Sequence, residues 1–200
     1  MSFYQFGRGL AAILLKPVYR IEVSFEEPVP EGRGFILACN HVSDMDPVVL
    51  GIAFPGQVRY MAKSELFKVP VLGFLIKHLG AFPVARGKGD HGAIDRAVSL
   101  VAEGGVLGIF PEGGRSKDGK FHKVKSGTVV VASQTAADIL PACIIYGPRR
   151  WFHRRVVTVK FGRVIRNEEL HITDHNKTEL RAANALLGGR IAALLGVEAP

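Results

Sequence analysis

The chain has 200 residues, of which 48% are hydrophobic, and this matches one globular domain with its own core and excludes long disorder. Its 26 Lys and Arg against 18 Asp and Glu give a formal charge of +8, which favours an anionic partner such as nucleic acid, a phosphorylated substrate or a membrane surface. The two cysteines, Cys39 and Cys143, are too few for a disulfide framework or a cysteine-rich zinc site. We expect both to be reduced core residues of a cytosolic protein.

The first 18 residues are set apart from the rest. Their apolar stretch is short and ends at Lys16-Pro17, so it does not fit a secretory signal, and no window of the chain reaches the length of a spanning helix. Residues 19–200 contain no repeat, low-complexity tract or linker, so we expect them to form a single domain.

Turn residues and apolar runs alternate along this domain. In chain order we predict strands at 19–25 and 34–39, a helix at 47–54, a strand at 58–62, a helix at 64–78 that tolerates Pro70, a strand at 81–85, a helix at 92–102, a strand at 106–110, a helix at 126–137, strands at 139–145 and 156–161, and a helix at 178–195. Strands separated by helices predict an α/β fold with a mainly parallel, mixed sheet flanked by helices on both faces.

A histidine and a carboxylate follow the second predicted strand. Ligand sites in such sheets gather beyond the carboxyl ends of the strands, and His41 and Asp46 lie in the loop after Cys39. A carboxylate that holds one ring nitrogen leaves the other to take a proton from a hydroxyl. The alternatives are that Asp46 only caps the helix begun by Pro47, or that Asp44 is the partner of the histidine.

A glycine-rich loop follows the strand at 81–85. Residues 87–92 read G-K-G-D-H-G, a G-x-G-x-x-G sequence between a strand and a helix, and Glu112 stands near the position of the expected acidic partner. A dinucleotide site is therefore one interpretation. The Lys, Asp and His within the loop, the bulky Arg86 before it, and its place after the first βαβ unit favour a polar surface loop instead.

Two more segments carry unusual residues at or after buried strands. Residues 110–116 read F-P-E-G-G-R-S, in which the glycines present backbone N–H groups and Arg115 offers a planar fork suited to phosphate oxygens. A tight turn with solvated charges is the alternative. Pro141 lies within an apolar run and predicts an edge strand, a strand start or a bulge.

These segments form four blocks in a fixed order. They are Asn40-His41-x-Ser43-x-x-Asp46, Gly80-x-x-Pro83-Val84-x-Arg86, Phe110-Pro111-Glu112-Gly113-x-Arg115-Ser116 and Leu140-Pro141. Through them, residues 20–165 resemble the glycerolipid acyltransferase family, specifically its bacterial 1-acyl-sn-glycerol-3-phosphate acyltransferases. The family usually has Thr at the position of Gly114 and often Asp at that of Ala85, so the chain departs from the pattern at these two positions.

The resemblance implies a direct acyl transfer without an acyl-enzyme intermediate. His41, oriented by Asp46, would remove the proton from the sn-2 hydroxyl of lysophosphatidate, and that oxygen would attack the thioester of acyl-carrier protein or acyl-CoA. Arg86 and Arg115 would hold the glycerol phosphate, and Glu112 would bind or order the polar head and Arg115. No metal and no bound cofactor are implied, because the acyl carrier brings the activated group.

The resemblance also implies roles for the remaining residues of the four blocks. Gly113 and Ser116 belong to the substrate-binding turn, whose backbone N–H groups would stabilise the oxyanion. Asn40 and Ser43 would support the histidine loop, and Pro141 would form a wall near the acyl group.

Because lysophosphatidate resides in the bilayer, the resemblance implies that the protein docks on a membrane. Residues 1–18 carry Phe, Leu and Ile side chains with Arg8 and Lys16, which predicts an interfacial helix, unless this segment only packs on the domain. Residues 151–155, W-F-H-R-R, are a second candidate for headgroup contact, with a solvated hairpin turn as the alternative. We expect a peripheral protein on the cytoplasmic face of the membrane, with an anionic surface as its partner and no nucleic acid.

Three classes of function remain in competition at this point. The first is an acyltransferase acting on lysophosphatidate or on another lysophospholipid. The second is a nucleotide-dependent oxidoreductase that uses the loop at 87–92, and the third is a noncatalytic module that binds anionic lipid.

Overall fold

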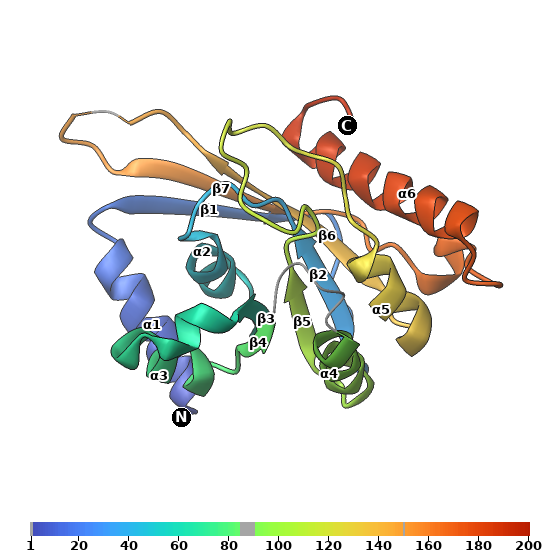
Figure 1. Cartoon of the computed structure of the whole chain (residues 1–200). Helices are drawn as coiled ribbons and strands as arrows, with labels where there is room; N and C mark the ends of the chain where they lie inside the picture. The colour runs from blue at the N-terminus through green and yellow to red at the C-terminus, as the bar shows by residue number, and fades with distance from the viewer. Residues whose placement is uncertain (1, 85–90, 150) are drawn as a thin grey trace.

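The computed structural model describes residues 2–84, 91–149 and 151–200 (Figure 1). Its described strands form one seven-stranded sheet in the order β1-β7-β6-β2-β5-β3-β4. The strands are β1 (Tyr19–Phe25), β2 (Phe35–Cys39), β3 (Val58–Lys63), β4 (Phe82–Val84), β5 (Val106–Ile109), β6 (Ile139–Tyr146) and β7 (Arg155–Phe161). Neighbouring strands in this sheet are parallel except β6 and β7, which form an antiparallel hairpin, so the predicted mainly parallel sheet is confirmed.

Helices cover both faces of the sheet (Figure 1). They are α1 (Phe3–Leu15), α2 (Asp46–Ala53), the 3-10 helix η1 (Ser64–Lys68), α3 (Pro70–His78), α4 (His91–Ala102), α5 (Gly127–Thr135), the 3-10 helix η2 (Asn167–Leu170) and α6 (Lys177–Leu195). Side chains alternate along a strand, so Ile36 and Ala38 of β2 join the core under α4, α5 and α6, whereas Leu37 and Cys39 join the core under α2. Cys39 and Cys143 are buried free thiols, and burial raises the pKa of both.

The predicted helix at 64–78 is wrong in one respect, because two helices occupy it. The 3-10 helix η1 ends at Lys68, and α3 begins at Pro70. Val69 between them is extended, with φ −79° and ψ 115°. A residue that precedes proline is pushed away from the helical region by the proline ring, so Pro70 starts a helix here and does not lie within one.

Pro141 occupies a central strand, between β7 and β2. Ile139 bridges to Ile165, and Ala142 pairs with Phe161. Between these two pairs the segment 161–165 therefore contains one residue more than the segment 139–142. The extra residue is a bulge, as one of the three alternatives predicted. The missing N–H of Pro141 therefore falls where the ladder is interrupted, while its carbonyl accepts a hydrogen bond from Gly162 N at 2.8 Å.

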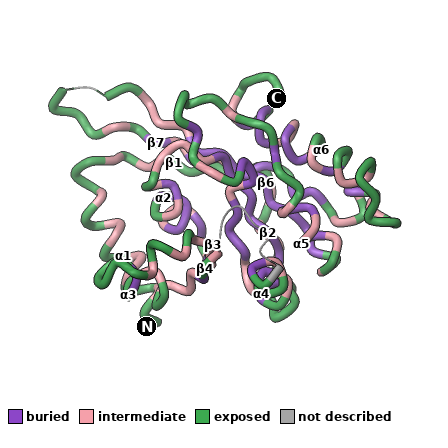
Figure 2. Tube along the Cα trace, in the orientation of Figure 1, coloured by how far each residue is buried: buried purple, intermediate pink, exposed green. Residues whose placement is uncertain are grey.

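Helix α1 contacts the rest of the protein through polar side chains. A capping box between Ser2 and Gln5 starts the helix. The Tyr4 hydroxyl then accepts a hydrogen bond from Val58 N, and Arg8 donates to the carbonyls of Phe54 and Pro55 at the carboxyl end of α2. Arg8 thus fixes α1 to α2. Figure 2 shows α1 in green and pink along its length, which means that none of its residues is buried.

Among the described residues, no helix is both long and apolar enough to cross a bilayer.

Candidate active site

His41 and Asp46 form a hydrogen-bonded pair just beyond the carboxyl end of β2. The Nδ1 atom of His41 lies 2.8 Å from Oδ2 of Asp46, the first residue of α2. The Asp46 side chain is 0% exposed and that of His41 is 13% exposed. Because the carboxylate holds Nδ1, Nε2 is the ring nitrogen that can take a proton from a hydroxyl.

Asp46 also organises the loop that carries the histidine. Its Oδ2 accepts hydrogen bonds from the backbone N–H groups of Val42 at 2.7 Å and Ser43 at 2.8 Å. Holding the loop before α2 and pairing with His41 are therefore two roles of one carboxylate. Asp44 takes neither role, because its exposed side chain forms an ion pair with Arg115.

Tyr146, at the end of β6, is a contact of the pair that the sequence analysis missed. Its hydroxyl donates a hydrogen bond to Oδ1 of Asp46 at 2.8 Å. Burial, and then the nearby Asp46 carboxylate, raise the pKa of Tyr146, which keeps the phenol protonated as a donor. Tyr146 is the first residue after the predicted strand at 139–145, so the rule that sites follow strand ends would have found it.

Phe110, which follows β5, supports the imidazole plane. Its ring stacks on His41 with centroids 4.2 Å apart and an interplanar angle of 21°, and the ring of Tyr60 in β3 lies parallel to it at 6.0 Å. Aromatic stacking of this kind restricts the rotation of the histidine ring. Three adjacent strands, β2, β5 and β3, thus contribute to its orientation.

Glu112 is buried and joins two loops. Its Oε1 accepts a hydrogen bond from His41 N at 2.8 Å, and its Oε2 accepts one from His122 N at 3.0 Å. Burial raises the pKa of this carboxyl, although both N–H groups favour its charged form. The expected ordering of Arg115 by Glu112 is not among the described contacts, where Arg115 pairs with Asp44.

The glycine-rich turn after β5 packs against the histidine loop. Ser116 N donates to the carbonyl of His41 at 2.7 Å, and Ser116 Oγ donates to Asp118 at 2.8 Å. Gly113 has φ +73°, a backbone conformation that strains a residue with a Cβ, so the turn favours glycine at this position. The turn and the loop therefore hold each other in place.

Asn40 and Ser43 support the same loop. The side-chain amide of Asn40 donates to the carbonyl of Ile144 at 3.1 Å and accepts from Ile144 N at 2.8 Å, which extends the contact between β2 and β6 beyond the last strand residue. Ser43 Oγ accepts a hydrogen bond from Met45 N at 3.2 Å. Pro141 is buried beside Ala38 within the sheet.

Two of the predicted features lie outside the described residues. Arg86 is one, and residues 87–90 of the glycine-rich loop are the other, while Gly92 belongs to α4. Within the parts of the chain that the structure describes, no group of three or more His, Cys, Asp or Glu side chains is arranged to hold a metal ion.

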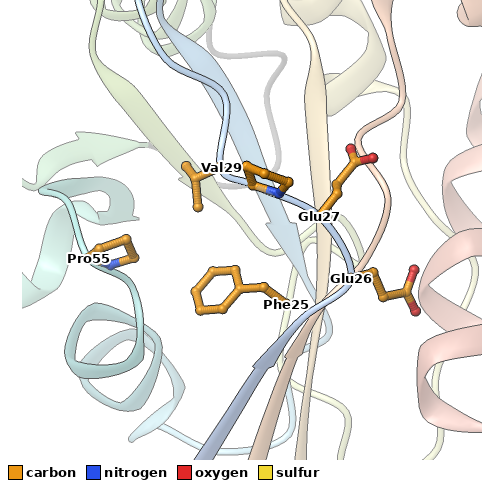
Figure 3. Close-up of a pocket in the computed structure, with 6 residues that line it drawn as sticks. Phe25, Glu26, Glu27, Val29 and Pro55 are labelled. Atoms are coloured by element: carbon orange, nitrogen blue, oxygen red, sulfur yellow. The ribbon is translucent and has the colours of Figure 1, made fainter.

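An open hollow on the surface is separate from this site (Figure 3). Its lining comes from the end of β1, the connection to β2 and the residue after Phe54, namely Phe25, Glu26, Glu27, Pro28, Val29 and Pro55. In Figure 3 the Phe25 ring points toward Pro55, whereas the carboxylates of Glu26 and Glu27 point away. Pro55 follows the end of α2 that is remote from Asp46, so this hollow is not part of the His41 group.

Several known proteins are similar to this chain over most of its length. The family model described as Acyltransferase matches residues 20–145. The 1-acyl-sn-glycerol-3-phosphate acyltransferase of Bacillus subtilis (strain 168) is 31% identical over 199 residues, covering 96% of this chain and 96% of that protein. The protein of the same name from Borreliella burgdorferi is 28% identical, covering 69% of this chain and 56% of its own.

A solved structure has the same fold. It is the crystal structure of the 1-acyl-sn-glycerophosphate (LPA) acyltransferase, PlsC, from Thermotoga maritima. The two chains superimpose with a TM-score of 0.71 at 24% identity, over 96% of this chain and 77% of that one.

Proposed function

Because the chain belongs to the acyltransferase family, we propose that it transfers an acyl group to the sn-2 hydroxyl of 1-acyl-sn-glycerol 3-phosphate and so forms phosphatidate for phospholipid synthesis. The donor is a thioester, acyl-carrier protein or acyl-CoA. The observation that carries the proposal is the 2.8 Å contact between His41 and a fully buried Asp46 at the carboxyl end of β2. Family membership removes the support for an oxidoreductase.

The proposed reaction needs one base and no covalent enzyme intermediate. Nε2 of His41 accepts the proton of the acceptor hydroxyl as the oxygen attacks the thioester carbonyl, so a C–O bond forms. The tetrahedral intermediate then collapses, the C–S bond breaks, and the leaving thiolate takes the proton back from His41. Asp46 holds the ring by Nδ1 in both steps and stabilises the imidazolium that forms between them.

The acceptor phosphate is assigned to two arginine side chains. Arg115 is half-exposed and lies one residue before Ser116, whose N–H is bonded to the carbonyl of His41. A guanidinium group matches phosphate oxygens with two parallel N–H donors, and phosphate would compete with the exposed carboxylate of Asp44 for it. Arg86 is the second proposed phosphate ligand, and the N–H groups of the glycine-rich turn are proposed for the oxyanion.

We also propose that the protein docks on the cytoplasmic face of an anionic membrane through α1 and the segment from η1 to α3. The outward side chains of α1 recur at helical spacing and are apolar, namely Phe3, Phe6, Leu10, Ile13 and Leu14. The second segment exposes Leu66, Val69, Val71, Leu72, Phe74 and Leu75. The two segments are adjacent, since the rings of Phe3 and His78 lie 5.4 Å apart. A surface of this extent is typical of an interaction site.

The activity test uses the purified protein with vesicles that contain lysophosphatidate and either thioester donor. We expect phosphatidate to form, and we expect His41→Ala to lower the rate by about 10²- to 10⁴-fold, the usual contribution of a general base. His175→Ala, in an exposed loop, is the matched control and should keep the wild-type rate. Near wild-type transfer by His41→Ala would exclude the mechanism, and a panel of other lysophospholipids identifies the acceptor.

A further inference from the structure

The hairpin between β6 and β7 carries two aromatic side chains into solvent. Trp151 is 87% exposed and Phe152 is 98% exposed. Their rings meet edge to face at 6.0 Å, and Phe152 has φ +61°, an unfavourable conformation for a residue with a Cβ. Figure 1 shows this hairpin projecting beyond the rest of the sheet. The chain thus adopts a strained turn that places two large apolar rings in water.

The hairpin leaves the sheet at the catalytic end. Tyr146, which bonds Asp46, is the last residue of β6, and Arg155 is the first residue of β7. The guanidinium of Arg155 lies 4.9 Å from the centre of the Tyr146 ring. The side chain of Tyr146 therefore links the base of the hairpin to the buried carboxylate of Asp46, which orients His41.

The hairpin also lies beside the end of α1. Arg155 N donates to the carbonyl of Val18, and Arg154 donates to that of Lys16 at 3.4 Å. Ile13, Leu14 and Val18 are exposed on this part of the chain. The aromatic tip therefore continues the apolar surface proposed above for membrane docking.

The charge around the tip has one sign. The chain from residue 139 to residue 167 has seven Lys and Arg and no Asp or Glu. Arg149 and Arg154 on the hairpin, and Lys16 beside it, are exposed. Aromatic rings flanked by arginine suit the headgroup region of an anionic bilayer, where the rings contact the apolar boundary and the cations contact phosphate.

We propose that Trp151 and Phe152 insert among the headgroups of an anionic bilayer as an anchor separate from α1. This proposal rests on the membrane reaction proposed above and adds an orientation to it. The adjacent segments α1 and η1 to α3 form one contact, on which the protein can still tilt, whereas a second contact at the hairpin restricts the tilt. The two contacts together turn the His41 end of the sheet toward the surface that holds the acceptor.

Trp151 is the only tryptophan of the chain, so its fluorescence reports the hairpin tip alone. The probe is a vesicle of equal parts phosphatidylcholine and phosphatidylglycerol without lysophosphatidate or donor. We expect a blue shift of the emission on binding and quenching by lipids brominated near the headgroup end of the acyl chain. Binding should weaken in high salt and on vesicles of phosphatidylcholine alone.

Single substitutions separate the aromatic and cationic contributions. Phe152→Ser should weaken partition into these vesicles by about tenfold, the effect of one apolar side chain that is no longer buried. Arg149→Gln should lower affinity only for the anionic vesicles. Val197→Ser removes an apolar side chain of the carboxyl-terminal segment, which is also exposed, and should leave partition unchanged.

An activity measurement separates failure of this proposal from failure of the proposed reaction. Trp151→Ser combined with Phe152→Ser should raise KM for lysophosphatidate in vesicles and leave turnover of a water-soluble, short-chain acceptor unchanged. An equal loss of activity on both acceptors would overturn the proposed anchor and leave the proposed reaction standing. If wild-type protein acylates neither acceptor, the proposed reaction fails, while the fluorescence experiment still tests the anchor.

Three other results contradict the anchor. One is unchanged Trp151 emission while the protein sediments with vesicles, because α1 and the segment from η1 to α3 would then dock without the hairpin. Another is an emission shift that tracks protein concentration without lipid, which would assign the tip to a contact between two copies of the chain. The third is a shift caused by an acidic carrier protein and not by vesicles.

Discussion

Two buried aspartates near the two ends of β6 show opposite uses of the same group. Asp46, bonded to Tyr146 at one end, accepts hydrogen bonds from two backbone N–H groups and a phenol, and its remaining contact is His41. Asp138, which precedes Ile139 at the other end, is 1% exposed and pairs with Arg33 at 2.6 Å and Arg166 at 2.9 Å. The first carboxylate has no arginine or lysine among its described partners, whereas the second has two arginines.

The difference explains which of the two can take part in catalysis. A carboxylate held by neutral donors keeps its charge available to attract the proton on an imidazole. A carboxylate neutralised by two guanidinium groups stabilises the fold, and here it connects the segments before β2 and after β7. Each aspartate can be tested by removing its charge and measuring turnover and stability separately.

The largest expected effect is on turnover, from Asp46→Asn. The amide would present a hydrogen to Nδ1 or lose the N–H contacts of the loop, and either outcome misorients His41. We expect kcat to fall by about 10³- to 10⁴-fold, as in other His–Asp systems. The measurement is phosphatidate formation under saturating substrates, with the circular dichroism spectrum recorded to show that the variant is folded. A variant with more than a tenth of wild-type kcat would contradict the assigned role.

The complementary variant, Asp138→Asn, should affect stability and leave kcat unchanged. We expect a loss of about 1.5 to 3 kcal/mol in the free energy of unfolding, the range for hydrogen bonds to charged groups. Denaturant unfolding at neutral pH measures it. A fall in kcat for folded protein would show that the two ends of β6 are not independent.

The stability contribution of Asp138 should depend on pH in a defined direction. Burial alone would raise the pKa of Asp138, but the N–H of Asn167 and the two arginines outweigh it and lower the pKa. A carboxyl with a lowered pKa in the folded state stabilises the fold above its unfolded pKa, about 3.9, and loses this contribution as the pH falls further through the folded pKa. The difference in the free energy of unfolding between wild type and Asp138→Asn, measured by denaturant unfolding, should therefore be constant near neutral pH and become smaller in acid.

Glu112→Gln tests whether the activity needs the hydrogen bond by which Glu112 holds the backbone N–H of His41. Two N–H groups, of His41 and His122, need two acceptor oxygens, and an amide offers one. One buried donor then lacks a partner, at a cost of about 1 to 3 kcal/mol, and we expect kcat/KM to fall by about 10- to 100-fold. If Glu112 binds the acceptor instead, KM for lysophosphatidate should rise while the stability of the free protein is unchanged.

The smallest effect is expected from Tyr146→Phe, which removes one of the donors to Asp46 and keeps the ring under Arg155. One hydrogen bond of this type contributes about 1.5 kcal/mol, so we expect a loss of about tenfold in kcat with a small change in melting temperature. Phosphatidate formation under saturating substrates and thermal unfolding measure the two effects. An unchanged kcat would show that Tyr146 is only a packing residue.

Most of the fold could be predicted from local patterns. The alternating run at 19–25 and the apolar run at 139–145 define strands to within a residue, because side-chain period and turn residues are local properties. The break at Val69 is also a local property, because the ring of Pro70 disfavours a helical conformation of the residue before it, so the single helix predicted at 64–78 misjudged a signal that the sequence contains. The hairpin of β6 and β7 follows from the lack of a helix between the two strands.

The excess of basic residues is likewise confined to a few segments of the sequence, although the tertiary structure decides what each of these residues contacts. The sequence places basic residues in 1–21, 113–127 and 139–167 with Asp118 as the only acid among them. The structure assigns Arg8 to the end of α2 and Arg166 to Asp138, so part of this charge is used within the fold. Arg149 and Arg154 remain exposed on the hairpin, where they support the proposed membrane contact.

The sequence by itself determined the residue types of the site and their order, because His41, Asp46, Glu112 and Arg115 each stand at or after a strand end that local patterns reveal. Only the tertiary structure decided which atoms meet. Asp46 and not Asp44 holds the imidazole, Glu112 holds backbone N–H groups and not Arg115, and Tyr146 reaches across from β6. The choice between Asp44 and Asp46 depends on where α2 begins beside the histidine loop. The contacts of Glu112 and Tyr146 depend on strand order, which joins residues about 70 to 100 positions apart, and no local pattern in the chain encodes such separations.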